Sequence, residues 1–186
     1  MIGTGDLKKG LTIEMDGQLY TIVDWEHIKT GRGSAQVRLK LKDLRAGHSI
    51  EKTFQSGSKF TPAHIEKRRS SYLYSENDLY YFMDTETYEQ TMINTDLLGD
   101  GVNYIKDGQE LEVMVYDEKA IGVELPNSVH LNITDTGPSF KGDTATGGNK
   151  PATLETGLIV QVPMFLNIGD TISVDTRTGT YLERVS

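Results

Sequence analysis

Short segments in which apolar and polar residues alternate follow one another along almost the whole chain. After residue 34, for example, Val37, Leu39 and Leu41 alternate with Arg38 and Lys40. A period of two places the apolar side chains on one face of a β-strand. On this pattern we expect strands at residues 11–15, 18–23, 35–41, 49–54, 71–74, 79–83, 87–93, 110–116, 120–124, 129–133, 158–162, 171–174 and 179–184.

Turn residues separate these segments every eight to twelve positions, as at Asp16-Gly17 and Ala46-Gly47. Glycine permits the positive φ of tight reversals, so these pairs mark turns. Helical content is expected to be small, with single turns at most at 95–98 and 102–105, each ended by glycine. Many short strands at this spacing predict an all-β protein made of barrels or sandwiches.

Two breaks divide the chain. The first lies at Thr61-Pro62-Ala63, and the second is Leu125-Pro126-Asn127, where a proline separates two strand-like runs. The resulting pieces, 1–63, 64–126 and 127–186, are each near the lower limit for an independent core. We expect three small closed barrels, because closure removes sheet edges that short strands leave unprotected.

The charge of the chain is distributed unevenly. Residues 1–69 hold 13 Lys and Arg against 8 Asp and Glu, whereas residues 70–186 hold 6 against 19. The two parts have net charges of +5 and −13, which sum to the −8 of the whole chain. The N-terminal part is therefore basic and suited to phosphate, although the whole chain is acidic. The start lacks the apolar core of a signal peptide, and no apolar run of about 18 residues exists, which predicts a cytoplasmic protein without membrane contact.

A single arginine stands between two glycines where strands 18–23 and 35–41 are connected. Gly31 and Gly33 supply the conformational freedom of a tight reversal and leave their neighbour unshielded. Arg32 is therefore expected at the apex of a hairpin, with its five donors pointing away from the body. One interpretation is an ordinary solvated charge; the other is a cation that reaches into a site closed to the rest of the chain.

No set of reactive side chains forms a catalytic pattern. The four histidines, His27, His48, His64 and His130, are far apart, and the chain contains no cysteine. This spacing provides no metal-ligand motif, and without a thiol there is no disulfide or Cys nucleophile. We expect no enzymatic activity, no metal and no cofactor.

The stretch from Gly142 to Lys150 resembles a nucleotide-binding P-loop only in part. Its lysine falls two positions late, and Pro151 follows where the first turn of a helix is needed, so we reject nucleotide hydrolysis. Lys141 and Lys150 at the ends of this glycine-rich loop still suit phosphate oxygens of RNA.

Aromatic residues gather in the middle piece, at Tyr72, Tyr74, Tyr80, Tyr81, Phe82 and Tyr88. By strand alternation, we expect Tyr72 and Tyr74 to share one face and Tyr80 and Phe82 another. A platform on which bases stack is one interpretation. The acidity of this piece favours the other, in which these residues form the core and rim of a barrel.

Several spaced motifs together resemble the bacterial elongation factor P family over the whole length of the chain. The most specific run is Lys150-Pro151-Ala152, four residues, Gly157, two residues, Val160-Gln161-Val162-Pro163, two residues, Leu166, two residues and Gly169. Further matches are Gly142-Asp143-Thr144, Asp175-Thr176-Arg177-Thr178-Gly179-Thr180-Tyr181, Val37–Lys42, Glu51–Phe54, Tyr72–Tyr74 and Phe82–Asp84.

This resemblance implies an N-terminal SH3-like, KOW-type barrel followed by two OB-type barrels in an L shape similar to tRNA. It implies a monomeric factor that binds the 70S ribosome, through rRNA of both subunits, between the P and E sites. There it would contact P-site peptidyl-tRNA stalled on consecutive prolines. The expected RNA-contacting residues are Lys29, Thr30, Gly31, Arg32, Gly33 and Ser34 at the tip, and Lys141, Gly142, Asp143, Thr144, Lys150, Tyr181 and Arg184 in the C-terminal piece.

One departure concerns the apex. Many family members carry lysine there, in a Lys-Pro-Gly-Lys-Gly pattern, and extend its amine; this chain has Arg32, and Thr30 replaces the proline. A guanidinium is a poor nucleophile, so amine acylation is implausible. Two states of Arg32 are possible on the sequence, an unmodified side chain and one modified by an enzyme such as a rhamnosyltransferase. Two alternative identities of the chain also stay open, an elongation-factor-P-like paralogue and a non-ribosomal KOW/OB adaptor.

Overall fold

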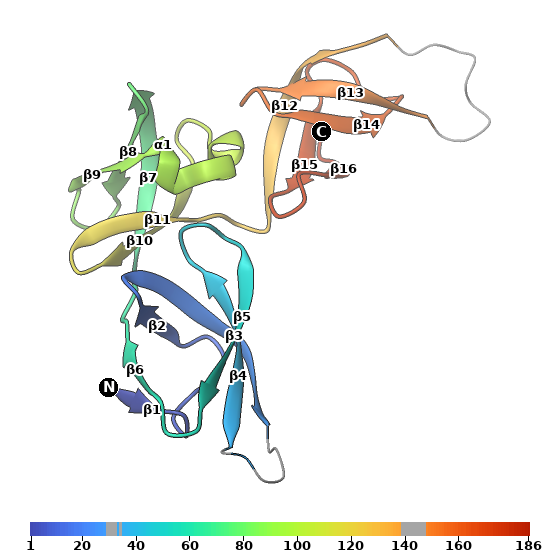
Figure 1. Ribbon diagram of the computed structural model, residues 1–186. Helices are drawn as coiled ribbons and strands as arrows, with labels where there is room; N and C mark the ends of the chain where they lie inside the picture. The colour runs from blue at the N-terminus through green and yellow to red at the C-terminus, as the bar shows by residue number, and fades with distance from the viewer. Residues whose placement is uncertain (29–32, 34, 139–147) are drawn as a thin grey trace. The chain divides into compact units, whose positions relative to one another are not determined.

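The computed structural model describes residues 1–28, 33, 35–138 and 148–186. Among these residues, sixteen strands account for nearly all regular structure, with one short helix α1 (Thr95–Leu98) and one 3₁₀ helix η1 (Gly99–Tyr104) (Figure 1). The all-β prediction is confirmed. Contacts group the chain into two compact units, Met1–Arg68 with Val113–Gly122, and Arg69–Glu112 with Val123–Ser186. The boundaries 1–63, 64–126 and 127–186 stay predictions.

The N-terminal sheet has six strands in the order β1-β6-β2-β3-β4-β5. Their bounds are Ile2–Gly3 (β1), Thr12–Met15 (β2), Gln18–Ile28 (β3), Gln36–Asp43 (β4), Ser49–Gln55 (β5) and Lys59–Pro62 (β6). Although β5 and β6 are four places apart in the sheet, Phe54 and Phe60 meet edge to face with ring centroids 5.0 Å apart. The sheet must therefore curl, which encloses a core of Leu7, Ile13, Tyr20, Ile22, Val37, Leu39, Leu41 and Phe60.

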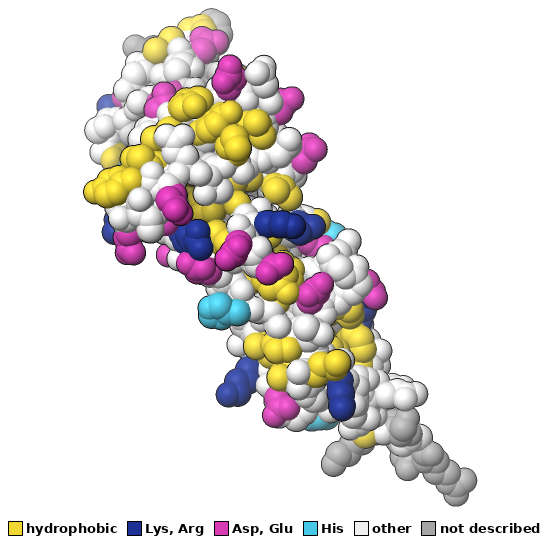
Figure 2. Space-filling view, turned by 90° about the vertical axis from the view of Figure 1, so that its left-hand side faces the viewer, with side chains coloured by type: hydrophobic (Ala, Val, Ile, Leu, Met, Phe, Trp, Pro, Cys, Tyr) yellow, Lys and Arg dark blue, Asp and Glu magenta, His cyan; other side chains and the backbone are white. Residues whose placement is uncertain are grey.

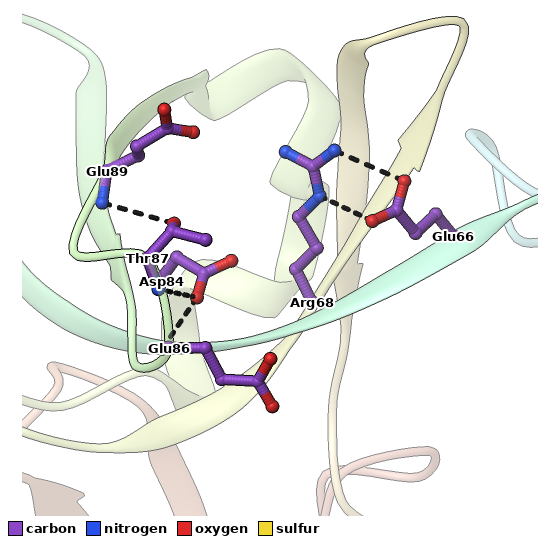
Figure 3. A network of polar contacts seen from close by, with 6 residues as sticks. All are labelled: Glu66, Arg68, Asp84, Glu86, Thr87 and Glu89. Atoms are coloured by element: carbon purple, nitrogen blue, oxygen red, sulfur yellow. Dashed lines mark hydrogen bonds and ion pairs between the residues drawn. The ribbon is translucent and has the colours of Figure 1, made fainter.

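The central sheet has the order β11-β10-β7-β8-β9. Its strands are Glu66–Glu76 (β7), Leu79–Asp84 (β8), Gln90–Asn94 (β9), Glu110–Tyr116 (β10) and Lys119–Glu124 (β11). At the start of β7, Arg68 donates to both carboxylate oxygens of Glu66, at 2.8 and 3.2 Å (Figure 3). Glu66 and Arg68 are two residues apart, so strand alternation places them on one face.

The β10–β11 hairpin groups with the N-terminal unit because its side chains pack there. Ile121 is buried with Leu19 and Ala63. The Tyr116 hydroxyl donates to Glu14 Oε2 at 2.9 Å. This hydrogen bond, followed by burial, raises the pKa of Tyr116. A mixed apolar and polar contact thus fixes this hairpin against β2 and β3.

The expectation that Tyr72 and Tyr74 share a face is wrong. Tyr72 lies opposite Phe82, whereas Tyr74 lies opposite Tyr81, because the register shifts between them. Tyr72 is buried and Tyr74 is 47% exposed. The bulge at Leu73 inserts one residue, which moves Tyr74 to the other face of the sheet.

The C-terminal sheet has the order β14-β13-β12-β15-β16. Its strands are Ser128–Thr136 (β12), Asn149–Leu154 (β13), Ile159–Pro163 (β14), Thr171–Asp175 (β15) and Tyr181–Arg184 (β16). The core consists of Tyr104 and the strand residues Val129, Leu131, Ile133, Ala152, Leu154, Val160, Val162, Ile172 and Val174, with Leu166 from the β14–β15 loop.

Helix η1 belongs to this C-terminal core. Tyr104 is buried among its strand residues, and burial is the main cause that raises the pKa of its hydroxyl. Next to it, Thr156 Oγ1 donates to the Asn103 carbonyl at 2.7 Å, and Lys106 Nζ donates to the His130 carbonyl at 2.8 Å. The segment after α1 is therefore tied to the C-terminal sheet by one buried ring and two hydrogen bonds.

Replacing Gly179 tests this attachment. Gly179 has φ +70°, and a Cβ there would lie 3.1 Å from the Tyr104 hydroxyl. Gly179→Ala should lower the free energy of unfolding by about 2 kcal/mol, from backbone strain and the close contact together. In a Tyr104→Phe background the loss should be smaller, because the obstructing oxygen is gone. Urea unfolding of the parent, the two single variants and the double variant measures the loss in each background. Equal losses with and without the Tyr104 hydroxyl would contradict the packing of η1 against the turn at Gly179.

Candidate nucleic-acid interface

The hairpin of β3 and β4 forms the stem that carries the predicted tip. The two strands pair from Tyr20 opposite Asp43 to Ile28 opposite Gln36. On β4, Val37, Leu39 and Leu41 are fully buried, so alternate residues anchor the stem over most of its length. Residues 29–35 thus connect two strands whose register is fixed on both sides.

A bulge lies within the stem. The register shifts between Ile22 and Asp24, and the extra residue, Val23, is 41% exposed. After the bulge, Trp25 faces Leu39 and packs against the core, and its ring meets His27 edge to face at 5.0 Å. Trp25 was not predicted from the sequence, because the alternation of apolar and polar residues ends at residue 23. Its one signal in the sequence is that it is the only tryptophan of the chain.

The outward face of the stem carries paired charges. Arg38 Nη1 lies 2.9 Å from Glu26 Oε1, and Lys9 Nζ lies 2.9 Å from Asp24 Oδ1. The Lys9 hydrogen bond, and then the Trp25 backbone N–H, lower the pKa of Asp24. Exposed pairs of this kind contribute little stability. Along β3 and β4, the cations Arg38, Lys40 and Lys42 are matched in number by the carboxylates Asp24, Glu26 and Asp43, so the stem carries no net charge.

Most of the predicted tip lies outside the described residues, namely Lys29, Thr30, Gly31, Arg32 and Ser34. Gly33 is described, as an exposed bend. In the C-terminal piece, Lys141, Gly142, Asp143 and Thr144 also lie outside the described residues. Their contacts with RNA stay predictions.

Lys150 is buried, with 5% of its surface exposed. Its Nζ donates to the Gly137 carbonyl at 2.9 Å, which ties the start of β13 to the chain just beyond β12. Alternation along β13 accounts for this position, since Lys150, Ala152 and Leu154 are all buried and two residues apart. Lys150 thus supports its own sheet, and its contact with RNA stays a prediction.

The two remaining predicted residues lie on β16, separated in the sheet order from β13 by β12 and β15. Tyr181 is partly buried against the C-terminal core. Arg184 Nη2 donates to Asp170 Oδ1 at 2.9 Å. The structure therefore gives both residues contacts within the fold and does not place them on a strand next to Lys150.

The turn before β16 is organised by one carboxylate. Asp175 accepts hydrogen bonds from the Arg177 side chain at 2.7 and 3.2 Å and from the Arg177 backbone N–H at 2.8 Å. These bonds lower the pKa of Asp175 to about 2, the side-chain hydrogen bond having the largest effect. This explains the Asp175–Tyr181 motif as a structural turn that starts β16.

Over the described parts of the chain, no group of three or more His, Cys, Asp or Glu side chains could hold a metal ion. No helix among those residues is long and apolar enough to cross a membrane.

Three family models match successive parts of the chain. The elongation factor P KOW-like domain matches residues 3–60, the elongation factor P OB domain matches 65–123, and the elongation factor P C-terminal domain matches 129–184. Elongation factor P of Thermoanaerobacter sp. is 55% identical over 185 residues, covering 100% of both chains. That of Moorella thermoacetica is 53% identical over 184 residues, covering 99% of this chain and 100% of the relative.

A solved structure has a similar fold. The eukaryotic translation initiation factor 5A from Methanococcus jannaschii has a TM-score of 0.52 at 23% identity, over 66% of this chain and 90% of that one. This neighbour supports the fold, whereas the elongation factor P KOW-like, OB and C-terminal domains in succession define a non-enzymatic translation factor. The chain belongs to the elongation factor P family, as its full-length relatives show.

The Asp175 turn predicts a pH dependence. Because the folded-state pKa is depressed from 3.8 to about 2, the carboxylate stabilises the fold above about pH 4, and this contribution is lost as the pH falls toward 2. Asp175→Asn should therefore lower the urea midpoint at pH 6, and its difference from the parent should shrink by pH 2.5. Asp107→Asn, at an exposed turn position, is the control for general acid effects. A difference that does not change with pH would contradict this role.

Proposed function

We propose that this elongation factor binds the 70S ribosome between the P and E sites and speeds peptide-bond formation at runs of proline. Full-length membership in the elongation factor P family carries the proposal. The β3–β4 stem supports it, because its fixed register sets where the loop with Arg32 emerges. In this proposal the chain acts in the cytoplasm as a monomer.

The proposed mechanism is positional. Proline is a poor nucleophile with restricted geometry, so a factor that holds the end of peptidyl-tRNA in a reactive pose removes part of the entropic barrier. Arg32 would contribute charge-assisted hydrogen bonds to the tRNA backbone in a site from which water is largely excluded. The C-terminal loop from Lys141 to Thr144 would contact RNA elsewhere on the ribosome. No side chain of the factor takes part in bond making.

The state of Arg32 decides the chemistry at the tip. A bare guanidinium presents five donors, whereas a sugar on one of its nitrogens would replace a donor by several hydroxyl groups. Intact-mass spectrometry of protein from its native cell separates these states. A mass equal to the bare chain, allowing for the initiator methionine, would exclude a tip-modifying enzyme as partner.

Removing the tip cation tests the proposal. Arg32→Ala should reduce the rate of peptide-bond formation on a Pro-Pro-Pro template by about tenfold or more, as expected from the loss of a charged hydrogen bond. Stability should stay within about 0.5 kcal/mol, as for an exposed site. Arg32→Lys should restore activity only in part, because an ammonium lacks the planar fork.

The matched control is Arg45→Ala, which removes the same side chain from an exposed turn of the same compact unit. It should leave the rate unchanged. If Arg32→Ala matches the parent, the tip is not the functional element. Failure to sediment with 70S ribosomes would instead favour an adaptor that acts away from the ribosome.

A further inference from the structure

The outer face of the β7–β8–β9 sheet carries a continuous row of large apolar side chains. Tyr74 lies directly opposite Tyr81 on the neighbouring strand, and Tyr81 lies opposite Met92 on the next. The two tyrosine rings stack with centroids 4.5 Å apart and an interplanar angle of 18°. Tyr74 is 47% exposed and Met92 is 59% exposed. We call these three residues the outer row.

The outer row is not required to complete the core. The opposite face of the same strands is filled by Tyr72, Phe82 and Ile93, which are 6%, 0% and 1% exposed. Tyr72 also contacts the rings of Tyr80 and Phe82 at 5.5 and 5.6 Å. The bulge at Leu73 is what sends Tyr74 outward instead of adding it to this packed face. Bulges often re-aim a side chain toward a functional surface.

The chain segment that carries the outer row is strongly acidic, and the basic residues just before it, Arg68 and Arg69, are paired with Glu66 and Glu110. Residues 70–105 contain no Lys or Arg and seven acidic residues, Glu76, Asp78, Asp84, Glu86, Glu89, Asp96 and Asp100. Glu76 is two residues from Tyr74 after the bulge, so it lies beside it on the outer face. In the space-filling view, the upper part of the molecule shows hydrophobic side chains gathered beside Asp and Glu side chains (Figure 2).

The β8–β9 turn contributes to this acidic rim through an ordered backbone. Asp84 Oδ1 accepts hydrogen bonds from the backbone N–H groups of Glu86 and Thr87, at 2.8 and 3.0 Å (Figure 3). The Glu89 N–H donates to Thr87 Oγ1 at 3.4 Å. The turn thus uses backbone groups of both glutamates, and their side chains project from it (Figure 3). The rim is therefore built into the turn rather than being a loose tail.

We propose that the outer row and its acidic rim dock a basic protein segment on the ribosome, one that carries Lys or Arg. Arginine and lysine stack favourably on tyrosine faces, and methionine adapts to irregular partner shapes. A carboxylate-rich rim attracts such a segment and repels the phosphates of RNA. The stacked tyrosines contact protein rather than bases. This inference rests on the proposed function, because the partner is sought on the 70S particle.

Charge reversal beside the row tests the sign of the interaction. Glu76→Lys should raise the Kd for purified 70S ribosomes by about three- to tenfold, because it repels a basic segment. Asp117→Lys makes the same change in net charge in the exposed β10–β11 turn, which belongs to the other compact unit, and should leave the Kd unchanged. A lower Kd for Glu76→Lys would identify RNA as the partner and overturn the inference. Equal shifts in both variants, or none, would also overturn it.

A second measurement identifies the contact directly. Photoreactive p-benzoylphenylalanine replaces Tyr81, which keeps an aromatic ring in the row, and Tyr88 serves as control because it is 71% exposed outside the row. On 70S ribosomes the Tyr81 probe should give a nuclease-resistant conjugate with a Lys- and Arg-rich protein segment that the Tyr88 probe does not give. A nuclease-sensitive conjugate, or none while the factor still co-sediments, would overturn this inference alone. Loss of co-sedimentation by the unsubstituted factor would overturn the proposed function and this inference with it.

Discussion

The fixed register of β3 against β4 is the constraint on which the proposed activity depends. Pairing continues to Ile28 opposite Gln36, while Val37, Leu39 and Leu41 hold β4 in the core. A slip of one residue would turn these three side chains to solvent, at a cost of several kcal/mol for the lost burial. The points at which β3 ends and β4 begins are therefore set by the N-terminal core. The charges of the stem balance one another and leave the tip residues as the distinctive cations of the hairpin.

Much of the fold could be predicted from alternation, and the failures have identifiable causes. The strand at 110–116 was predicted with its bounds, because Leu111, Val113 and Val115 alternate without interruption. Strand β3 was predicted five residues too short, since the bulge at Val23 breaks the pattern there. Strands β1 and β6 were missed because they are short. Strand β13 was also missed, and it contains Pro151, which cannot donate to a strand ladder. The pairs of β12 with β13 begin at Ala152, so the missing N–H of Pro151 falls just outside that ladder.

The candidate site was less predictable, because charge and motif do not show where a side chain points. Lys150 was expected to contact RNA, yet its ammonium donates to a carbonyl of its own barrel. Arg184 has Asp170 as its partner, and the Asp175–Tyr181 motif forms a turn. These contacts stabilise the fold, and the RNA contacts of the same residues stay predictions. Lys150, Ala152 and Leu154 alternate along the sequence, and this pattern places the lysine on the buried face of a strand. Lysine is rarely buried, however, so its residue type favours an exposed position.

The two halves of the charge distribution have different physical consequences. A basic hairpin tip gains energy from phosphate only while nearby carboxylates do not oppose its approach. In the stem, Asp24 and Glu26 are each paired with a cation, Lys9 and Arg38. The segment 70–105 has no such balance, since it contains acidic residues and no basic ones. On a particle made of RNA and protein, that segment is repelled by phosphate and attracted to basic protein surfaces. Opposite charge in successive parts of one chain therefore favours a single orientation on the ribosome, because reversing the factor would set carboxylates against RNA and leave the tip cations without phosphate.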